Sequence, residues 1–211
     1  IREGGGEPSF LGYKTRPDDV PFPSAFCLSV NEEIVHGLGN RSRVLKEGDL
    51  LGLDVGCWFK GLCTDMAVTV PVGRISAEHA ILIKATRQSL FEAIASVRPG
   101  AMISDIGRAV ERIVKPHGYG IIKSLTGHGV GHKVHEDPRV PNFVDRNESP
   151  VLMIKGLCLA IEPMIALGSD RVKTADDGWA VCMADGKAGA HFEITVAVTD
   201  HGADILTPLP I

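Results

Sequence analysis

Acidic residues interrupt three stretches of this sequence that are otherwise typical of buried β-strands. Asp54 lies between Leu-Leu-Gly-Leu and Val, Glu162 follows Leu-Ala-Ile, and Glu193 opens the run Glu-Ile-Thr-Val-Ala-Val. A buried carboxylate is costly unless it is paired or bound to a metal ion. A single acid of this kind is most often a salt-bridge partner or a strand-edge residue. Several in one chain indicate that they share a cation.

A fourth acid, Asp65, belongs to a predicted hairpin with Asp54. The strand that carries Asp54 ends near Lys60-Gly61, which predicts a tight turn, and the next strand covers residues 64–72. One strand cannot bring the two aspartates together because they lie too far apart along the chain. Neighbouring strands of a hairpin can point both side chains to the same side of a sheet.

Histidines cluster in the segment Gly127–Pro138, which contains His128, His132 and His135 among three glycines. Glycine permits close backbone approach, and neutral imidazole is the commonest metal ligand near neutral pH. The segment is a weak signal alone, but beside four buried acids it indicates a metal site. Mixed oxygen and nitrogen ligands suit Mn, Fe, Co or Zn, and five such ligands can hold two divalent ions that promote hydrolysis.

Strand-like segments dominate both ends of the chain, and two helices are expected in its middle. Ser76 is the expected N-cap of a helix that ends near Val97, and Ser104 that of a second helix closed by residues 116–118. This order predicts an α+β fold in which helices cover one face of a curved, mostly antiparallel sheet. With 211 residues, of which 44% are hydrophobic, we expect residues 1–211 to form a single domain.

Composition argues against several other classes of protein. The net charge is −4, so a nucleic-acid partner is not expected, and the apolar runs are too short for a membrane span. Five cysteines without paired spacing favour a reducing, cytoplasmic location. We expect a monomer.

Several short motifs resemble type I methionine aminopeptidases, members of the pita-bread group that also includes Xaa-Pro aminopeptidase, prolidase and creatinase. The ligand order Asp54, Asp65, His128, Glu162, Glu193 is that of the group. The motifs that narrow the resemblance are segments 31–37, 127–131, 135–138, 161–163 and 177–179. The resemblance runs from about Tyr13 to Thr207 and implies the pita-bread fold, with a single metallopeptidase domain and a pseudo-twofold relation between its halves.

The resemblance also implies roles for individual residues. Asp54 would bind one ion, His128 and Glu162 the other, and Asp65 and Glu193 both. Glu162 would be the general base or proton shuttle. Two histidines that are not ligands, His36 and His135, would contact the substrate and stabilise the tetrahedral intermediate. The walls of the methionine pocket would be Tyr13, Phe22, Cys27, Val134 and Trp179.

The implied activity is removal of N-terminal methionine from nascent proteins and peptides, at the ribosome or free, when the second residue is small. A hydroxide activated by two divalent ions (Co, Mn, Fe or Zn) would attack the first peptide carbonyl. One alternative is a Xaa-Pro aminopeptidase or prolidase, and another is a metal-free binding protein of the same fold.

The remaining histidines are assigned no role. His132 is expected either near the site or in solvent, and the sequence gives no usable signal for His79, His117, His191 and His201.

Departures from the family pattern leave all five ligands in place. Ile194 stands where many members have histidine, and Phe22 where tyrosine is common. The segment Lys14–Pro21 is longer than usual, which affects the alignment of the pocket wall. The helical segment that usually precedes this region is absent, which indicates either a trimmed N-terminus or an unusually short member.

Overall fold

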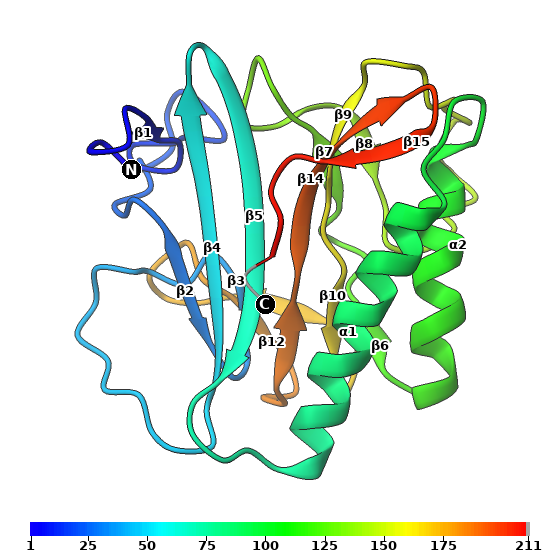
Figure 1. The fold of residues 1–211 in the computed structure, drawn as a ribbon. Helices are drawn as coiled ribbons and strands as arrows, with labels where there is room; N and C mark the ends of the chain where they lie inside the picture. The colour runs from blue at the N-terminus through cyan, green and yellow to red at the C-terminus, as the bar shows by residue number, and fades with distance from the viewer. Residues whose placement is uncertain (210–211) are drawn as a thin grey trace.

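The computed structural model describes residues 1–209, and its largest unit is a nine-stranded sheet in which every strand pair is antiparallel (Figure 1). The path through the sheet is β1-β4-β5-β14-β9-β7-β8, with β2 paired to β4 and β15 to β14. The strands are β1 (Glu7–Pro8), β2 (Cys27–Val30), β4 (Leu50–Phe59), β5 (Leu62–Pro71), β7 (Gly127–Gly129), β8 (Glu136–Val140), β9 (Cys158–Ile161), β14 (Glu193–Thr199) and β15 (Gly202–Ile205).

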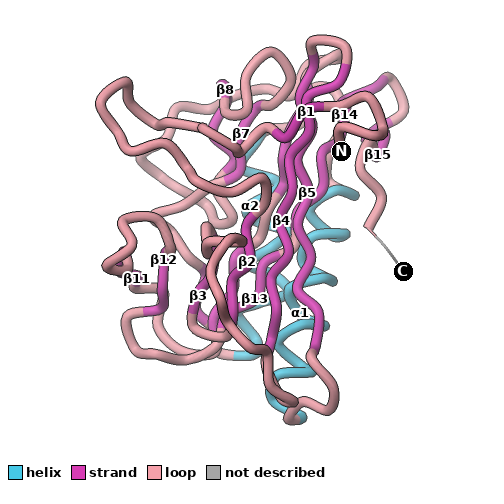
Figure 2. The backbone as a smooth tube through the Cα atoms, turned by 90° about the vertical axis from the view of Figure 1, so that its left-hand side faces the viewer, coloured by secondary structure: helices cyan, strands magenta, loops and turns pink. Residues whose placement is uncertain are grey.

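Two three-stranded sheets complete the β-structure of the described chain. One has the order β13 (Gly189–His191), β10 (Met164–Ala166), β6 (Gly120–Ile121), and the other β11 (Val172–Thr174), β12 (Val181–Met183), β3 (Glu33–Val35). In Figure 2, β11 and β12 lie on one side of β4 and β5, and the helices lie on the other. The molecule is therefore layered, as the α+β prediction requires.

The helices are α1 (Ala77–Ala95) and α2 (Ile103–Val114), followed by the 3₁₀ turn η1 (Lys115–His117). Ser76 caps α1 as predicted, because its side chain accepts a hydrogen bond from the backbone N–H of His79 at 3.1 Å. No helix in residues 1–209 is long and apolar enough to cross a membrane.

The predicted cap of α2 was wrong. Helix α2 begins one residue before Ser104, and its N-cap is Met102. The carboxylate of Asp105 accepts a hydrogen bond from the backbone N–H of Met102 at 3.0 Å. An acid in the first turn thus satisfies the free backbone donor, which is half of a capping box.

Alternation along the strands separates the helix-covered core from the opposite face. Leu159 and Ile161 of β9, with Ile194 and Val196 of β14, pack against both helices in the main core. Residues between them face the other way, and Ala160 belongs to a second apolar cluster there. Ile194, which replaces the more usual histidine, is thus a core residue.

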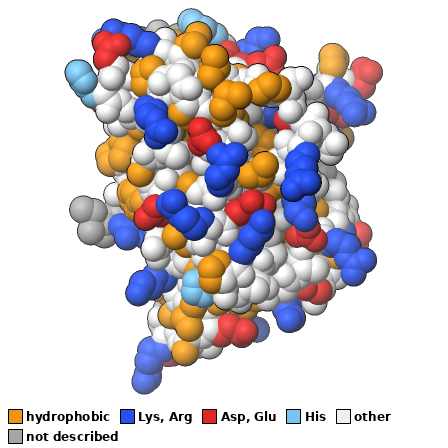
Figure 3. Space-filling model, turned by 90° about the vertical axis from the view of Figure 1, so that its right-hand side faces the viewer, with side chains coloured by type: hydrophobic (Ala, Val, Ile, Leu, Met, Phe, Trp, Pro, Cys, Tyr) orange, Lys and Arg blue, Asp and Glu red, His pale blue; other side chains and the backbone are white. Residues whose placement is uncertain are grey.

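The outward side of the helices is charged. Figure 3 shows this side, with Lys and Arg mingled with Asp and Glu. Arg112 of α2 donates a hydrogen bond to Glu92 of α1 at 2.6 Å, but an exposed ion pair contributes at most about 1 kcal/mol. The apolar face therefore holds the helices on the sheet.

We expect Ile106→Ala to lower the free energy of unfolding by about 2–5 kcal/mol, because Ile106 is fully buried between α2 and the sheet. Urea denaturation of the metal-free protein measures the effect. The matched control is Ile81→Ala on α1, where Ile81 is 46% exposed and a change below about 1 kcal/mol is expected. Equal losses for the two variants would contradict the assignment of the core.

Candidate metal centre

Three of the four predicted acids lie along one row that crosses the main sheet. Asp54 of β4 is opposite Ala67 of β5, and Ala67 is opposite Glu193 of β14. Glu162 directly follows β9, and continuing the β9–β14 register by one residue places it opposite Glu193. Paired residues share a face, so the small side chain of Ala67 leaves room for the carboxylates around it.

The neighbouring row carries His128 and Asp65. His128 of β7 is opposite Ala160 of β9, which is opposite Thr195 of β14. The hydroxyl of Thr195 links β14 to β5, because it accepts a hydrogen bond from Asp65 N–H at 2.9 Å and donates one to Asp65 O at 2.7 Å. This contact fixes the backbone of Asp65, so the two rows bring all five predicted ligands to one face.

The side-chain atoms converge within the span of a metal site. Ligand atoms of Asp65, His128 and Glu193 all lie within 4.8 Å of one another. His128 Nε2 is 3.4 Å from Glu162 Oε1, and His128 Nδ1 is 2.8 Å from the carbonyl oxygen of Gly129. Since that carbonyl can only accept, Nδ1 carries the proton and Nε2 keeps a free lone pair, which is the form that binds metals.

Burial makes the carboxyl groups hard to ionise in the absence of a cation. It raises the pKa of Asp54 to about 6 and that of Glu162 to about 7. The pKa values of Asp65 and Glu193 lie well above the usual range, first because of burial and then because of neighbouring carboxylates.

Two of these acceptors also lack partners. Asp54 Oδ1 and Glu193 Oε1 are buried and have no hydrogen-bond partner among the described residues. Such atoms are costly unless a missing group satisfies them. The site therefore fits a divalent cation bound by carboxylate and imidazole.

His36 and His135 border the same cavity as the acids. Burial lowers the pKa of His36 to about 4 and that of His135 to about 3, with nearby histidines adding to both shifts. Both are therefore neutral at pH 7. His36 has a left-handed backbone with φ of 60°, which is uncommon outside glycine and is found at sites where a side chain must be aimed. Tyr13 OH lies 2.6 Å from His135 Nδ1.

The cavity has a volume of about 420 Å³, and the five predicted ligands form the polar part of its lining, the floor. Four of the predicted wall residues line it as well, and Phe22 and Trp179 meet edge to face with ring centroids 5.1 Å apart. The fifth, Val134, does not line the cavity and packs instead in the second apolar cluster, to which Phe22 and Cys27 also belong. The predicted wall residues on the cavity are Tyr13, Phe22, Cys27 and Trp179.

Some lining residues were missed by the sequence analysis: Phe10, Thr15, Val35, Ser124, Leu125, Thr126, Arg139, Met164 and His191. Most reach the cavity from loops or short strands, for which local sequence offers no signal. His191 is different, because it lies two residues before Glu193 in an extended stretch. Alternation from Glu193 would have placed His191 on the face of the predicted ligands, but this signal was not used in the sequence analysis.

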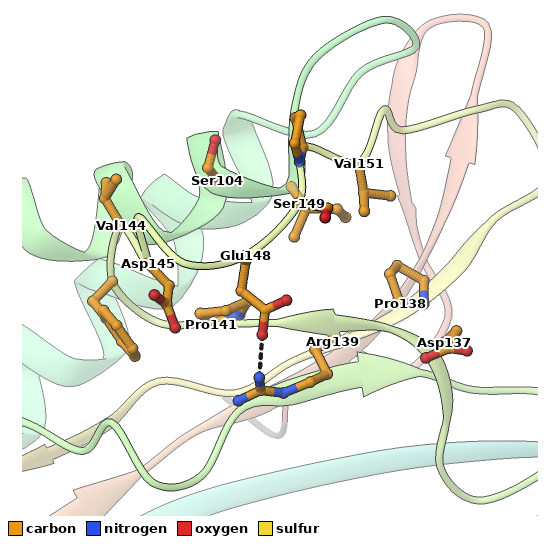
Figure 4. Close-up of a pocket in the computed structure, with 13 residues that line it drawn as sticks. Ser104, Asp137, Pro138, Arg139, Pro141, Val144, Asp145, Glu148, Ser149 and Val151 are labelled. Carbon is orange, nitrogen blue, oxygen red and sulfur yellow. Dashed lines mark hydrogen bonds and ion pairs between the residues drawn. The ribbon is translucent and has the colours of Figure 1, made fainter.

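A second cavity of about 510 Å³ lies beside the N-terminus of α2 (Figure 4). Arg139 lines both cavities and forms an ion pair with Glu148 at the second one. The acids that line it are Asp137, Asp145 and Glu148, and no histidine joins them among the described residues. The groups suited to metal binding are thus concentrated in the first cavity.

Comparison with known proteins identifies the class. The family model for metallopeptidase family M24 matches residues 4–200. A methionine aminopeptidase from Aquifex aeolicus is 42% identical over 206 residues, which cover 97% of this chain and 80% of that protein. The crystal structure of methionine aminopeptidase from Thermotoga maritima has a TM-score of 0.92 and 39% identity, covering 99% of this chain and 81% of that one.

A prolidase from Pyrococcus furiosus shares the fold at a TM-score of 0.70 and 23% identity, over 88% of this chain and 49% of that one. The pita-bread fold predicted from the sequence is therefore confirmed. The chain belongs to metallopeptidase family M24, a class of metal-dependent hydrolases. Within that family it belongs with the methionine aminopeptidases, which confirms the resemblance of its motifs.

We expect the metal-free protein to lose stability as the pH rises from 7 to 8. A carboxyl whose pKa is raised by folding keeps a proton that the unfolded chain has released, and removing it costs stability above the unfolded pKa. The buried histidines oppose this only weakly, since above pH 7 they are mostly neutral in both states. Urea denaturation at the two pH values measures the change.

Two further results belong to the same expectation. Glu193→Gln should flatten the pH dependence, and calorimetry at pH 7 should detect proton release when a divalent ion binds. Stability that rises over this pH interval, or binding without proton release, would contradict the raised pKa values.

Proposed function

We propose that this chain removes the N-terminal methionine from nascent proteins and peptides whose second residue is small. The observation that carries the proposal is that one cavity combines two kinds of lining. Its floor holds four carboxyl groups and the imidazole of His128, and its wall holds aromatic side chains and the thiol of Cys27. A free amine and a peptide carbonyl suit the floor, and an unbranched apolar side chain suits the wall. The relatives named methionine aminopeptidase support the same conclusion.

The ligand set suits two divalent ions of the Mn, Fe, Co or Zn type. Asp54 is the proposed ligand of one ion, His128 and Glu162 of the other, and Asp65 and Glu193 of both. This division is supported by the His128–Glu162 approach of 3.4 Å and by the buried setting of the other acids. Bound ions would supply Lewis acidity toward the carbonyl and activation of water.

Glu162 is the proposed proton shuttle. Its pKa of about 7 in the metal-free site shows how strongly burial favours the protonated carboxyl there. With a cation bound, this pKa would fall and the carboxylate would be ionised, so that it can take a proton from the attacking water and deliver it to the departing amine. Its carboxylate also lies beside His128, which keeps it at the floor of the cavity.

His36 and His135 are the proposed contacts to the substrate carbonyl. With Tyr13 donating its hydroxyl proton to Nδ1 of His135, the ring proton lies on Nε2 and is available as a donor. A neutral donor that strengthens its contact as negative charge develops on oxygen favours the transition state over the bound substrate.

A Xaa-Pro peptidase or prolidase activity is the nearer alternative. Prolidases share this fold, but at 23% identity the likeness extends to the fold alone. A non-catalytic binding protein is disfavoured because all five ligand residues are present. We further propose that residues 1–211 act as one domain, as a monomer in the cytoplasm, on chains emerging from the ribosome or already released.

His135→Ala is expected to retain bound metal but to lower kcat by about 100-fold or more, because a donor to the transition state is lost. Metal content by elemental analysis and steady-state kinetics measure the two effects. Tyr13→Phe is the matched variant with a smaller expected loss of kcat, because it keeps the histidine and removes only its 2.6 Å contact with the tyrosine hydroxyl. If metal content falls together with activity in His135→Ala, the histidine is a ligand and the assignment is wrong.

Peptide competition tests the specificity. Met-Ala-Ser should be cleaved faster than Met-Leu-Ser, because fixing the scissile bond at the metal centre brings the second side chain against the cavity wall. Norleucine in place of methionine should cost only about 10–200-fold, since a pocket that discriminates by small apolar differences supplies about 1–3 kcal/mol. Faster cleavage of Ala-Pro-Ser would favour the Xaa-Pro alternative, and a chelator should abolish cleavage of every peptide tested.

A further inference from the structure

A second imidazole, that of His191, lies beside the carboxylates and approaches the oxygen of Glu162 that His128 does not. His191 is only 4% exposed, and its Nε2 atom has no hydrogen-bond partner among the described residues. That atom lies 3.5 Å from Glu162 Oε2 and 3.8 Å from Glu193 Oε2. Each oxygen of the Glu162 carboxylate therefore has an imidazole beside it, because His128 Nε2 lies 3.4 Å from Glu162 Oε1.

These separations match neighbouring ligands on one ion. Two ligand atoms that each lie 2.0–2.2 Å from an ion are roughly 2.8–3.6 Å apart at octahedral or tetrahedral angles. The distance from His191 Nε2 to Glu162 falls in this range, and that to Glu193 lies just beyond it. One ligand atom from each of Glu162, His191 and Glu193 can be chosen within 4.8 Å of the other two.

The backbone holds His191 in this position. Its N–H donates to Thr69 Oγ1 at 2.9 Å, and the same hydroxyl donates to His191 O at 2.8 Å. On the other side, His191 of β13 pairs with Met164 of β10. Thr195 makes the same pair of hydrogen bonds to the N–H and C=O of Asp65. A threonine hydroxyl therefore fixes the backbone of this histidine in the same way as that of a predicted ligand.

We propose that His191 is a further protein ligand, bound through Nε2 to the ion that Glu162 and Glu193 hold. The inference deepens the proposed function, because it rests on the metal centre and adds a second nitrogen donor to it. Replacing an oxygen or water ligand by imidazole favours ions that prefer nitrogen, such as Zn²⁺ and Co²⁺, over Mn²⁺.

The test uses Zn²⁺ alone as the probe, added to the full chain labelled with ¹⁵N in its histidine rings. Zinc-bound imidazole nitrogens are counted by NMR before and after His191→Gln and His128→Gln. Each substitution should remove one zinc-bound nitrogen, and each should weaken Zn²⁺ binding at least 10-fold by competition calorimetry. His117→Gln, at an exposed position in η1, is the control and should change neither quantity.

The outcomes separate the two proposals. If His128→Gln removes a zinc-bound nitrogen and His191→Gln does not, His191 is not a ligand, and its role is at most a hydrogen bond to Glu162. If neither removes one, the metal centre itself is wrongly assigned. Should a variant fail to fold, the unaltered protein still decides, because a single zinc-bound imidazole in it overturns the proposal.

Discussion

The structure depends on the mutual repulsion and desolvation of four carboxyl groups that are held on one face of a sheet. Nothing among the described side chains neutralises them fully, since two of their oxygens are buried without partners. Burial of the apolar core on the other face of the same strands offsets this free-energy cost. A cation that binds the folded chain recovers part of it, so metal binding and folding are thermodynamically linked.

Antiparallel pairing is what makes the cluster possible. The predicted ligands come from four strands and from the residue after a fifth, β9, but they occupy two neighbouring cross-strand rows. A register slip by one residue would exchange every ligand with a core residue. The hydroxyls of Thr69 and Thr195 hold the register between β5 and the strands opposite, where backbone pairing is short. These two threonines therefore support the site without touching a ligand atom.

The sequence predicted the features that depend on local pattern. Alternation and turn chemistry predicted the hairpin at Lys60-Gly61, and capping chemistry predicted the cap at Ser76. The family was identified from the resemblance of short motifs instead. Where two local signals competed, the prediction failed, as at Ser104, where an acid in the first turn moved the start of α2. The cavity wall was predicted only in part, because residues such as Phe10 and Arg139 reach it through tertiary packing. His191 was missed for another reason, since its strand position was informative but no neighbouring motif drew attention to it.

The floor and the wall of the cavity are built differently, and this bears on specificity. The floor consists of residues on or next to paired strands, so its geometry is fixed by the sheet. The wall comes from segments such as the one around Tyr13 and Phe22, which lie in irregular structure. Such segments tolerate insertions and substitutions better than paired strands do. A shared fold with prolidase at 23% identity is consistent with this division, because the sheet can persist while the wall changes. On the proposed function, the metal centre would determine which bond is broken, and the loops around it would determine which N-terminal residue reaches that bond.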